Sequence, residues 1–401
     1  MHFDSFIDRA NDCAKRRGAL CHVRLSALIL IKASLNIPQS GMINNTKNLT
    51  KEAYMNFYTQ QHQYYCGIDL HAKTMYLCII NQEGNIVLQR DIRTDPGVFL
   101  KTIERYREDI VVAVECIFTW YWIADLCAQE NIPFILGHAL YMKAIHGGKA
   151  KNDKIDAHKI AVLLRGGMIP MAYVYPQQMR STRDLLRRRM HLTRKRAELL
   201  AHIQNTNYQY NLPEIGKKIA YKANREGVSE RFPDESVRKS IELDLKLLDY
   251  YDQLLPPLEH EISLIAKIHD ADSYFRIRSI PGIGRILGLV ILYEIHDIHR
   301  FPRVQDFVSY CRLVKSAKES AGKRLGSSGK KIGNVHLKWA FSEAAVLFLR
   351  RNLQARKYRD KLVKKHGKAK SMTILAHKLA RATYYILKRK EVFHMNTFFE
   401  K

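Results

Sequence analysis

Two short apolar segments in the first third of the chain each carry one acidic residue. The first reads YCGIDLH over residues 65–71 and contains Asp69, and the second reads VVAVEC over residues 111–116 and contains Glu115. A charge inside a buried, strand-like apolar run is costly unless another group pairs with it. These segments therefore predict two strands of a sheet whose acids face a partner.

A second pair of acids stands at the start of a predicted helix over Asn152–Arg165. Asp153 and Asp156 are three residues apart, which places their Cβ atoms about 5–6 Å apart on one helix face. If the fold brings all four carboxylates together, two Mg²⁺ ions about 3.5–4 Å apart would neutralise them and act on a phosphodiester. First-turn acids are also favoured by the helix dipole, by about 0.3–1 kcal/mol each, so this pair alone does not require a metal.

The chain is strongly basic. Its 401 residues include 66 Lys and Arg against 39 acids, which gives a net charge of +27. Such an excess indicates a polyanionic partner, nucleic acid before an anionic membrane, and the alternative is a basic but inert surface. Hydrophobic residues make up 46% of the chain, enough for a real core, and the length predicts two or three domains.

The cysteines and the first apolar segment bear on location. The seven cysteines contain no Cys-x-x-Cys pair and no zinc spacing, which favours a reducing cytoplasm without a structural zinc. The stretch Leu25–Leu35 is broken by Lys32, is too short to span a bilayer and lacks the small-residue cleavage site of a secretory signal. We expect a cytoplasmic protein with no membrane partner.

The order of elements predicts an α/β domain over residues 62–176. It follows an amino-terminal extension, residues 1–61, which is either an ordered appendage, a disordered tail or the result of an early start codon before Met42 or Met55. Hairpin-linked strands followed by alternating helices and strands predict a mixed sheet covered by helices. The predicted strands are Tyr65–Leu70, Met75–Asn81, Ile86–Asp91, Ile110–Glu115 and Pro133–Leu136, and further helices are predicted over Pro96–Arg107 and Trp120–Glu130.

Residues 177–272 predict a long helical hairpin or coiled coil, with helices over 178–208 and 236–268. Its first arm is basic, with twelve Lys and Arg against three acids from Arg180 to Arg225. A solvated helix face is the usual role of such a run, but this imbalance favours contact with a nucleic-acid backbone. The candidate contacts are Arg180, Arg183, Arg187, Arg188, Arg189, Arg194, Lys195 and Arg196.

Residues 273–401 predict a mainly helical domain. Its helices are expected over 284–295, 303–312, 334–351 and 371–390, with a Lys-, Gly- and Ser-rich loop over Val314–Gly333 and a basic run over Arg350–Lys370. Before the first helix stands PGIG over residues 281–284, which indicates either a helix-hairpin-helix turn or an ordinary turn before a helix. In the first case Gly282 and Gly284 would leave backbone N–H groups free for a phosphate.

Three motifs of the first domain carry a specific resemblance. CGIDLH (residues 66–71), AVE (113–115) and KNDKIDAHKIA (151–161) resemble the DEDD transposases of the insertion-sequence one-hundred-ten group, to which pilin-gene invertases are related. The resemblance implies an RNase-H-like, Holliday-junction-resolvase-like domain. It also implies that the Asp-Glu-Asp-Asp tetrad falls on Asp69, Glu115, Asp153 and Asp156, with two bound Mg²⁺ ions.

The third region resembles the second domain of the same family. The motifs are FVSYCRLV (307–314), ESAG (319–322) and GKKIGN (329–334). The resemblance implies a nucleophilic serine that forms a phosphoserine link to DNA, matched best by Ser320, with Ser316, Ser327 and Ser328 as competitors. Three cations of the same loop would hold the scissile phosphate: Lys318, Lys323 and Arg324. Lys330 and Lys331 are further candidates for contact with nucleic acid.

The resemblance also implies partners. Members of this family act on donor and target DNA and are guided by a bridge RNA encoded in the element, so base pairing reads sequence while the protein holds shape and backbone. A site shared between subunits would imply a homo-oligomer, a dimer or a tetramer.

Three functions remain open from the sequence. The first is a Mg²⁺-dependent DNA transposase and recombinase that forms a serine–DNA intermediate. The second is a metal-dependent nuclease or junction resolvase in which water attacks. The third is a non-catalytic nucleic-acid-binding helical protein.

Overall fold

The computed structural model describes residues 56–145, 152–314, 318–320, 323–326, 332–350 and 352–400. Of these, residues 144, 318–320 and 324–326 are described by their backbone alone. Residues 1–55, most of the predicted extension, lie outside the described residues. Among the described residues, no helix is long and apolar enough to cross a membrane.

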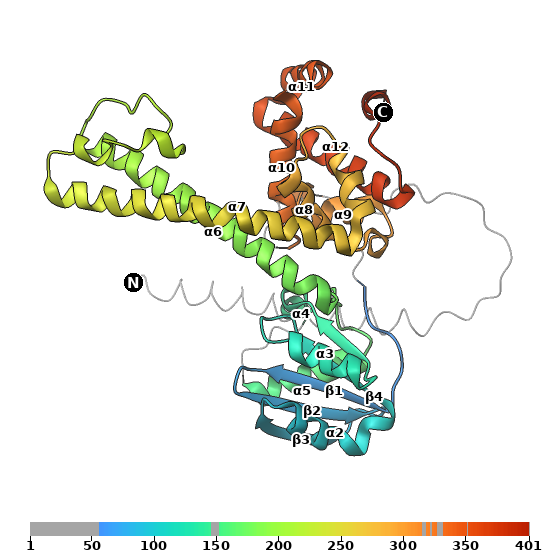
Figure 1. Cartoon of the computed structure of the whole chain (residues 1–401). Helices are drawn as coiled ribbons and strands as arrows, with labels where there is room; N and C mark the ends of the chain where they lie inside the picture. Colours follow the sequence, from blue (N-terminus) through green and yellow to red (C-terminus); the bar gives the residue numbers. More distant parts are fainter. Residues whose placement is uncertain are drawn as a thin grey trace, which may run out of the picture. The chain divides into compact units, whose positions relative to one another are not determined.

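The first domain is built on a five-stranded mixed sheet with the order β3-β2-β1-β4-β5 (Figure 1). Strand β2 pairs antiparallel with both β1 and β3, whereas β4 is parallel to β1 and β5 is parallel to β4. The strands are β1 (Tyr64–Leu70), β2 (Thr74–Asn81), β3 (Ile86–Arg93), β4 (Ile110–Glu115) and β5 (Phe134–Gly137). The predicted mixed sheet is confirmed, and its order fits an RNase-H-like domain.

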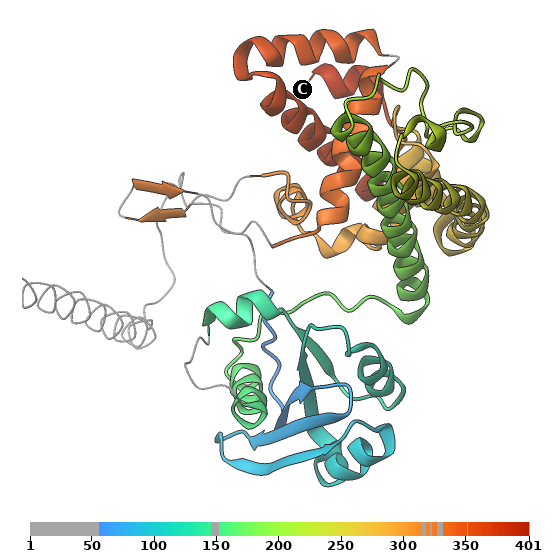
Figure 2. The same ribbon diagram turned by 90° about the vertical axis from the view of Figure 1, so that its left-hand side faces the viewer.

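Helices cover both faces of this sheet (Figure 2). On one face α2 and α3 contribute Phe99 and Ile123 to a core that includes Ile68 of β1. On the other face α5 contributes Ala157 and Ala161 to a second core. The helices of this domain are α2 (Pro96–Ile103), the 3₁₀ helix η1 (Glu104–Asp109), α3 (Tyr121–Gln129), α4 (Ala139–Ile145) and α5 (Asp153–Arg165).

The predicted long helical hairpin is observed as α6 (Gln177–Gln209) and α7 (Glu235–Arg278). Helix α7 runs ten residues beyond the predicted end at 268, and Asp270 interrupts it with non-helical backbone angles. The Asp270 Oδ1 accepts from Ser273 N at 2.9 Å, as an N-cap does, so a second helical segment begins there. A coiled coil stays a prediction.

The hairpin contributes to two separate cores. Its distal end encloses Ile203, Phe232 and Leu248, together with the short helices η2 (Lys222–Asn224) and η3 (Ser229–Arg231). Its base, including Met179 of α6 and Ile262 of α7, instead packs into the core of the carboxyl-terminal helices. The base of the hairpin and those helices therefore share one core, and the proposed limit at residue 272 stays a prediction.

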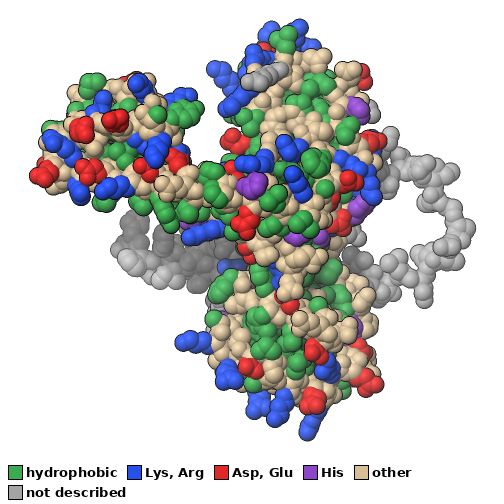
Figure 3. All heavy atoms as spheres, in the orientation of Figure 1, with side chains coloured by type: hydrophobic (Ala, Val, Ile, Leu, Met, Phe, Trp, Pro, Cys, Tyr) green, Lys and Arg blue, Asp and Glu red, His purple; other side chains and the backbone are tan. Residues whose placement is uncertain are grey.

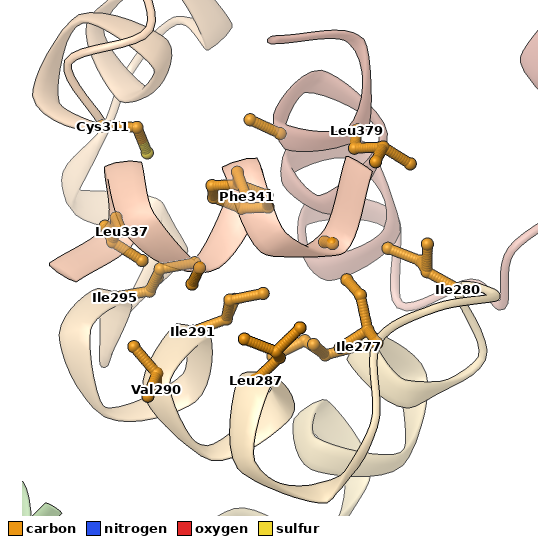
Figure 4. Close-up of a cluster of buried hydrophobic side chains, with 14 of the residues drawn as sticks. Ile277, Ile280, Leu287, Val290, Ile291, Ile295, Cys311, Leu337, Phe341 and Leu379 are labelled. Atoms are coloured by element: carbon orange, nitrogen blue, oxygen red, sulfur yellow. The ribbon is translucent and has the colours of Figure 1, made fainter. Parts of the chain in front are cut away.

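The last region is helical around the same core, in which Leu287, Ile291 and Phe341 pack together (Figure 4). Its elements are α8 (Arg285–Ile295), η4 (Ile298–Arg300), α9 (Val304–Tyr310), β6 (Lys318–Ser320), β7 (Lys323–Gly326), α10 (Val335–Arg350), α11 (Leu353–His366), α12 (Lys368–Arg389) and α13 (Met395–Glu400). The predicted loop over 314–333 contains the β6–β7 hairpin, and the basic run over 350–370 contains α11. Helix α11 buries Ala355 alone among its residues, so its sequence lacks the apolar periodicity that predicts a helix.

Candidate active site

The acids of β1 and β4 end neighbouring parallel strands at one edge of the sheet. The register pairs Ile68 with Val114, so Asp69 and Glu115 are the next residues on adjacent strands. Because side chains alternate along a strand, Asp69 lies on the same face as Tyr65, which packs in the core beneath α5. The strands therefore deliver both predicted carboxylates to the face that α5 covers.

Gly67 allows α5 to approach this face closely. A Cβ at Gly67 would lie 2.3 Å from the carbonyl oxygen of Ala157 and 2.4 Å from the amide nitrogen of Ala161. Helix α5 begins at Asp153, where the Asn152 Oδ1 accepts from Ile155 N at 2.8 Å. Since Ala157 lies one turn after Asp153 and crosses over Gly67, the first turn of α5 reaches the end of β1.

Two of the predicted acids meet a histidine at this point. Asp69, His71 and Asp153 each offer one ligand atom, and these atoms all lie within 4.8 Å of one another. The His71 Nε2 is 3.6 Å from the Asp69 Oδ2 and 3.6 Å from the Asp153 Oδ2. The side chain of Asp69 is 19% exposed, whereas those of His71 and Asp153 are 51% and 58% exposed, so a substrate has access.

The other two predicted acids, Glu115 and Asp156, are not members of this three-residue group. Glu115 is half-buried beside Asp69 by register. Asp156, also half-buried, accepts from Lys159 Nζ at 3.1 Å, an ion pair within α5. The group that offers ligand atoms at one point thus contains two of the four predicted acids and His71. Two carboxylates and an imidazole are donors that divalent cations use, so the residues fit a metal.

Ser320 ends the first strand of the β6–β7 hairpin. The register places Ser320 opposite Lys323 and Glu319 opposite Arg324, while Lys318 pairs with Gly326. The backbone thus brings two of the predicted cations to the strand that faces the serine. The other candidates of this loop lie outside the described residues: Ser316, Ser327, Ser328, Lys330 and Lys331.

The two ends of the chain segment that carries this hairpin are joined by hydrogen bonds. Asn334 N donates to the Tyr310 carbonyl at 2.6 Å, and Arg312 Nε donates to the Gly333 carbonyl at 2.9 Å. Gly333 has a φ of +90°, and a Cβ there would lie 2.6 Å from the Tyr310 carbonyl oxygen, so the closure requires glycine.

Asn334, at the end of this segment, also contacts a fully buried acid, Glu294 of α8. Its carboxylate accepts from Arg187 Nε at 2.7 Å, from Arg183 Nε at 3.1 Å and from Asn334 Nδ2 at 2.7 Å. Burial opposes ionisation of Glu294, but the hydrogen bonds and charges of these partners outweigh it and lower its pKa to about 2. The sequence patterns do not predict a role for Glu294 or its pairing with the basic helix α6.

Most of the predicted contact residues on α6 already have acidic partners. Arg183 and Arg187 bind Glu294, and the other pairs are Arg180 with Asp125, Arg189 with Glu259, Arg196 with Asp252 and Lys195 with Glu198. Arg188 and Arg194 are exposed and make no ion pair within the described residues. Lys and Arg side chains also spread over the carboxyl-terminal helices in Figure 3.

The two predicted glycines occupy the turn between α7 and α8. Gly282 has a φ of +87°, and a Cβ there would lie 2.5 Å from the amide nitrogen of Phe348 in α10. Close packing against α10 thus accounts for Gly282. Gly284 is exposed at the N-cap of α8, with no atom within 4 Å of an added Cβ.

Comparison with known proteins agrees with this architecture. A DEDD transposase model of the IS110 group matches residues 66–211, and a model described as the transposase IS116/IS110/IS902 family matches residues 275–360. A transposase for insertion sequence element IS1111A from Coxiella burnetii is 24% identical over 338 residues, which cover 82% of this chain and 90% of that protein. The chain belongs to the IS110 group of DEDD transposases.

This membership sets aside one of the functions that the sequence left open. The chain is a DNA transposase, so the non-catalytic alternative is set aside and DNA is its substrate. A family of this type uses divalent metal ions, and the group of Asp69, His71 and Asp153 offers ligands for one.

Proposed function

We propose that this transposase cuts and rejoins DNA with Mg²⁺ held by Asp69, Glu115, Asp153 and Asp156, and with Ser320 as the nucleophile. The observation that supports the metal site is the meeting of β1 and α5 over Gly67. It brings the ligand atoms of Asp69 and Asp153 to within 4.8 Å of each other on an accessible edge.

The four acids would hold two ions between the strand ends and the first turns of α5. When bound, Mg²⁺ would neutralise the carboxylates, activate the attacking oxygen and stabilise the leaving oxygen of the phosphodiester. The Lys159 ammonium, bound to Asp156 at 3.1 Å, would orient that carboxylate.

The nucleophilic step exchanges one phosphodiester bond for another. The Ser320 hydroxyl attacks the scissile phosphorus, a bond from serine oxygen to phosphorus forms, the bond from phosphorus to a DNA oxygen breaks, and that oxygen takes up the serine proton. A hydroxyl of the second DNA end then attacks the phosphoserine and releases Ser320. Lys323, opposite Ser320 in the hairpin, and the neighbouring Arg324 would hold the phosphate.

The partners we propose are donor DNA, target DNA, an element-encoded bridge RNA and further copies of this chain. Exposed cations on α6, Arg188 and Arg194, are the first candidates for backbone contacts because neither forms an ion pair with an acid among the residues that the structure describes. A homo-oligomer would allow the acids of one copy to serve the serine of another. The RNA dependence is tested by strand cleavage with and without RNA transcribed from the flank of the element.

The decisive experiment for the nucleophile is detection of a covalent protein–DNA adduct on denaturing gels. The parent protein with Mg²⁺ and its DNA should form the adduct, and Ser320→Ala should abolish it. Ser342→Ala removes an exposed hydroxyl that donates to Lys338 O at 2.8 Å, and should leave the adduct unchanged. If Ser320→Ala still cleaves without an adduct, water is the nucleophile. If Ser327→Ala or Ser328→Ala loses the adduct instead, the serine was wrongly chosen.

A further inference from the structure

His71 lies between the two acids of the candidate metal site, and no role has been assigned to it. It directly follows β1, two residues after Asp69, so the alternation of the strand sends both side chains to the α5 face. Its backbone is held at both ends: His71 N donates to Thr74 O at 3.0 Å, and Thr94 Oγ1 donates to His71 O at 3.0 Å. These two hydrogen bonds therefore fix the position of the His71 backbone, from which the imidazole extends, relative to β1.

The distances suit one shared cation. Ligand atoms bound to one ion at about 2.0–2.2 Å lie about 3.0–3.5 Å apart in octahedral or tetrahedral geometry. The Nε2 of His71 is 3.6 Å from a carboxylate oxygen of Asp69 and 3.6 Å from one of Asp153. Both distances from Nε2 are close to this range, and the ligand atoms of all three residues lie within 4.8 Å of one another.

We propose that His71 Nε2 is a direct ligand of the ion held by Asp69 and Asp153, and that it makes this site favour Mn²⁺ over Mg²⁺. This inference rests on the proposed metal site and adds a nitrogen ligand to it. Mg²⁺ prefers oxygen ligands, whereas an imidazole nitrogen suits the first-row transition metals better. The tetrad alone would offer only oxygen.

The competing account is that His71 is an exposed side chain that pairs with the acids only when protonated. Protonation at Nε2 blocks the lone pair that a metal needs, so the two accounts exclude each other at the nitrogen. They differ in whether that nitrogen is bonded to the ion, which spectroscopy detects directly.

The test is pulsed electron paramagnetic resonance of Mn²⁺ bound to the full chain. We expect modulation from a directly bound ¹⁴N in the parent protein, and its replacement by a ¹⁵N signal when the histidines are labelled with ¹⁵N. The labelling needs no substitution, so it does not depend on whether a variant folds. His71→Ala should lose the nitrogen signal, and His158→Ala, in α5 but outside the metal-binding group, should keep it.

Metal affinities supply a second readout. Titration calorimetry with Mn²⁺ and with Mg²⁺ should show that His71→Ala weakens Mn²⁺ binding about tenfold or more and Mg²⁺ binding less, so the preference for Mn²⁺ shrinks. Bound Mn²⁺ without nitrogen coupling in the parent protein would overturn the role of His71 and leave the carboxylate site standing. If the parent protein binds no Mn²⁺ at all, the proposed metal site itself is wrong.

Discussion

Gly67→Ala is the sharpest perturbation of the junction that forms the candidate site. The added methyl would lie 2.3 Å from Ala157 O, 2.4 Å from Ala161 N and 3.0 Å from Ala161 Cα. All three are backbone atoms, so no side chain can rotate away to relieve the clash. Helix α5 has to move outward from β1 by about 1 Å to restore ordinary contact distances near 3.5 Å.

The expected cost follows from overpacking a close backbone contact. Inserting one methyl into a well-packed core costs about 1–3 kcal/mol, and the absence of a flexible neighbour places Gly67→Ala near the upper end. The same movement carries Asp153 away from Asp69, because Asp153 lies one turn before Ala157 on α5. We therefore expect a loss of metal affinity together with the loss of stability.

Urea unfolding followed by tryptophan fluorescence measures the first effect. Trp120 and Trp122 are two of the three tryptophans and lie at or in α3 of the same domain. The control is Gly97→Ala in the first turn of α2, where the nearest atom to the added Cβ is Asp95 Oδ1 at 3.4 Å, so the free energy of unfolding should stay within about 0.5 kcal/mol of the parent value. If Gly67→Ala proves as stable as that control, the close approach of α5 does not hold.

Three further predictions concern other parts of the chain. Glu294→Gln leaves the buried Arg183 and the half-buried Arg187 without their counter-charge, and should lower the free energy of unfolding by about 3–5 kcal/mol at pH 7. Because the folded pKa of Glu294 is about 2, below its usual 4.5, its contribution is present above pH 4.5 and is lost as pH falls toward 2, so parent and variant should converge in acid unfolding curves. Asn152→Ala removes the N-cap of α5 and should cost about 0.5–2 kcal/mol in urea unfolding. Arg188→Gln should reduce the salt dependence of DNA binding by about one phosphate contact in a log–log plot of affinity against salt, whereas Arg189→Gln, whose partner is Glu259, should not; equal slopes would contradict the role of exposed α6 cations.

The sheet and the position of its acids could be predicted because each depends on local pattern. The apolar runs of β1 and β4 are continuous, so Asp69 and Glu115 stand out as charges at strand ends. The start of α5 was predicted within one residue, because Asn152 is a strong N-cap and the apolar positions of the helix follow it.

Features that depend on tertiary contacts escaped prediction. His71 carries the same alternation signal as Asp69, but only the approach of Asp153 gives it a partner. The pairing of Arg187 with Glu294 joins residues 107 positions apart, and from sequence the arginine is indistinguishable from the exposed Arg188 beside it. A charge count along a helix does not show which charges are already neutralised inside the fold.

The most direct test of the metal site is anomalous X-ray scattering from crystals of the full chain grown with Mn²⁺ and its DNA. We predict an anomalous peak within coordination distance of Asp69 and Asp153, at the edge where β1 and β4 end, and its loss in Asp69→Asn. Mn²⁺ bound at another place, with this edge empty while the DNA is cleaved, would contradict the assignment of these acids to catalysis.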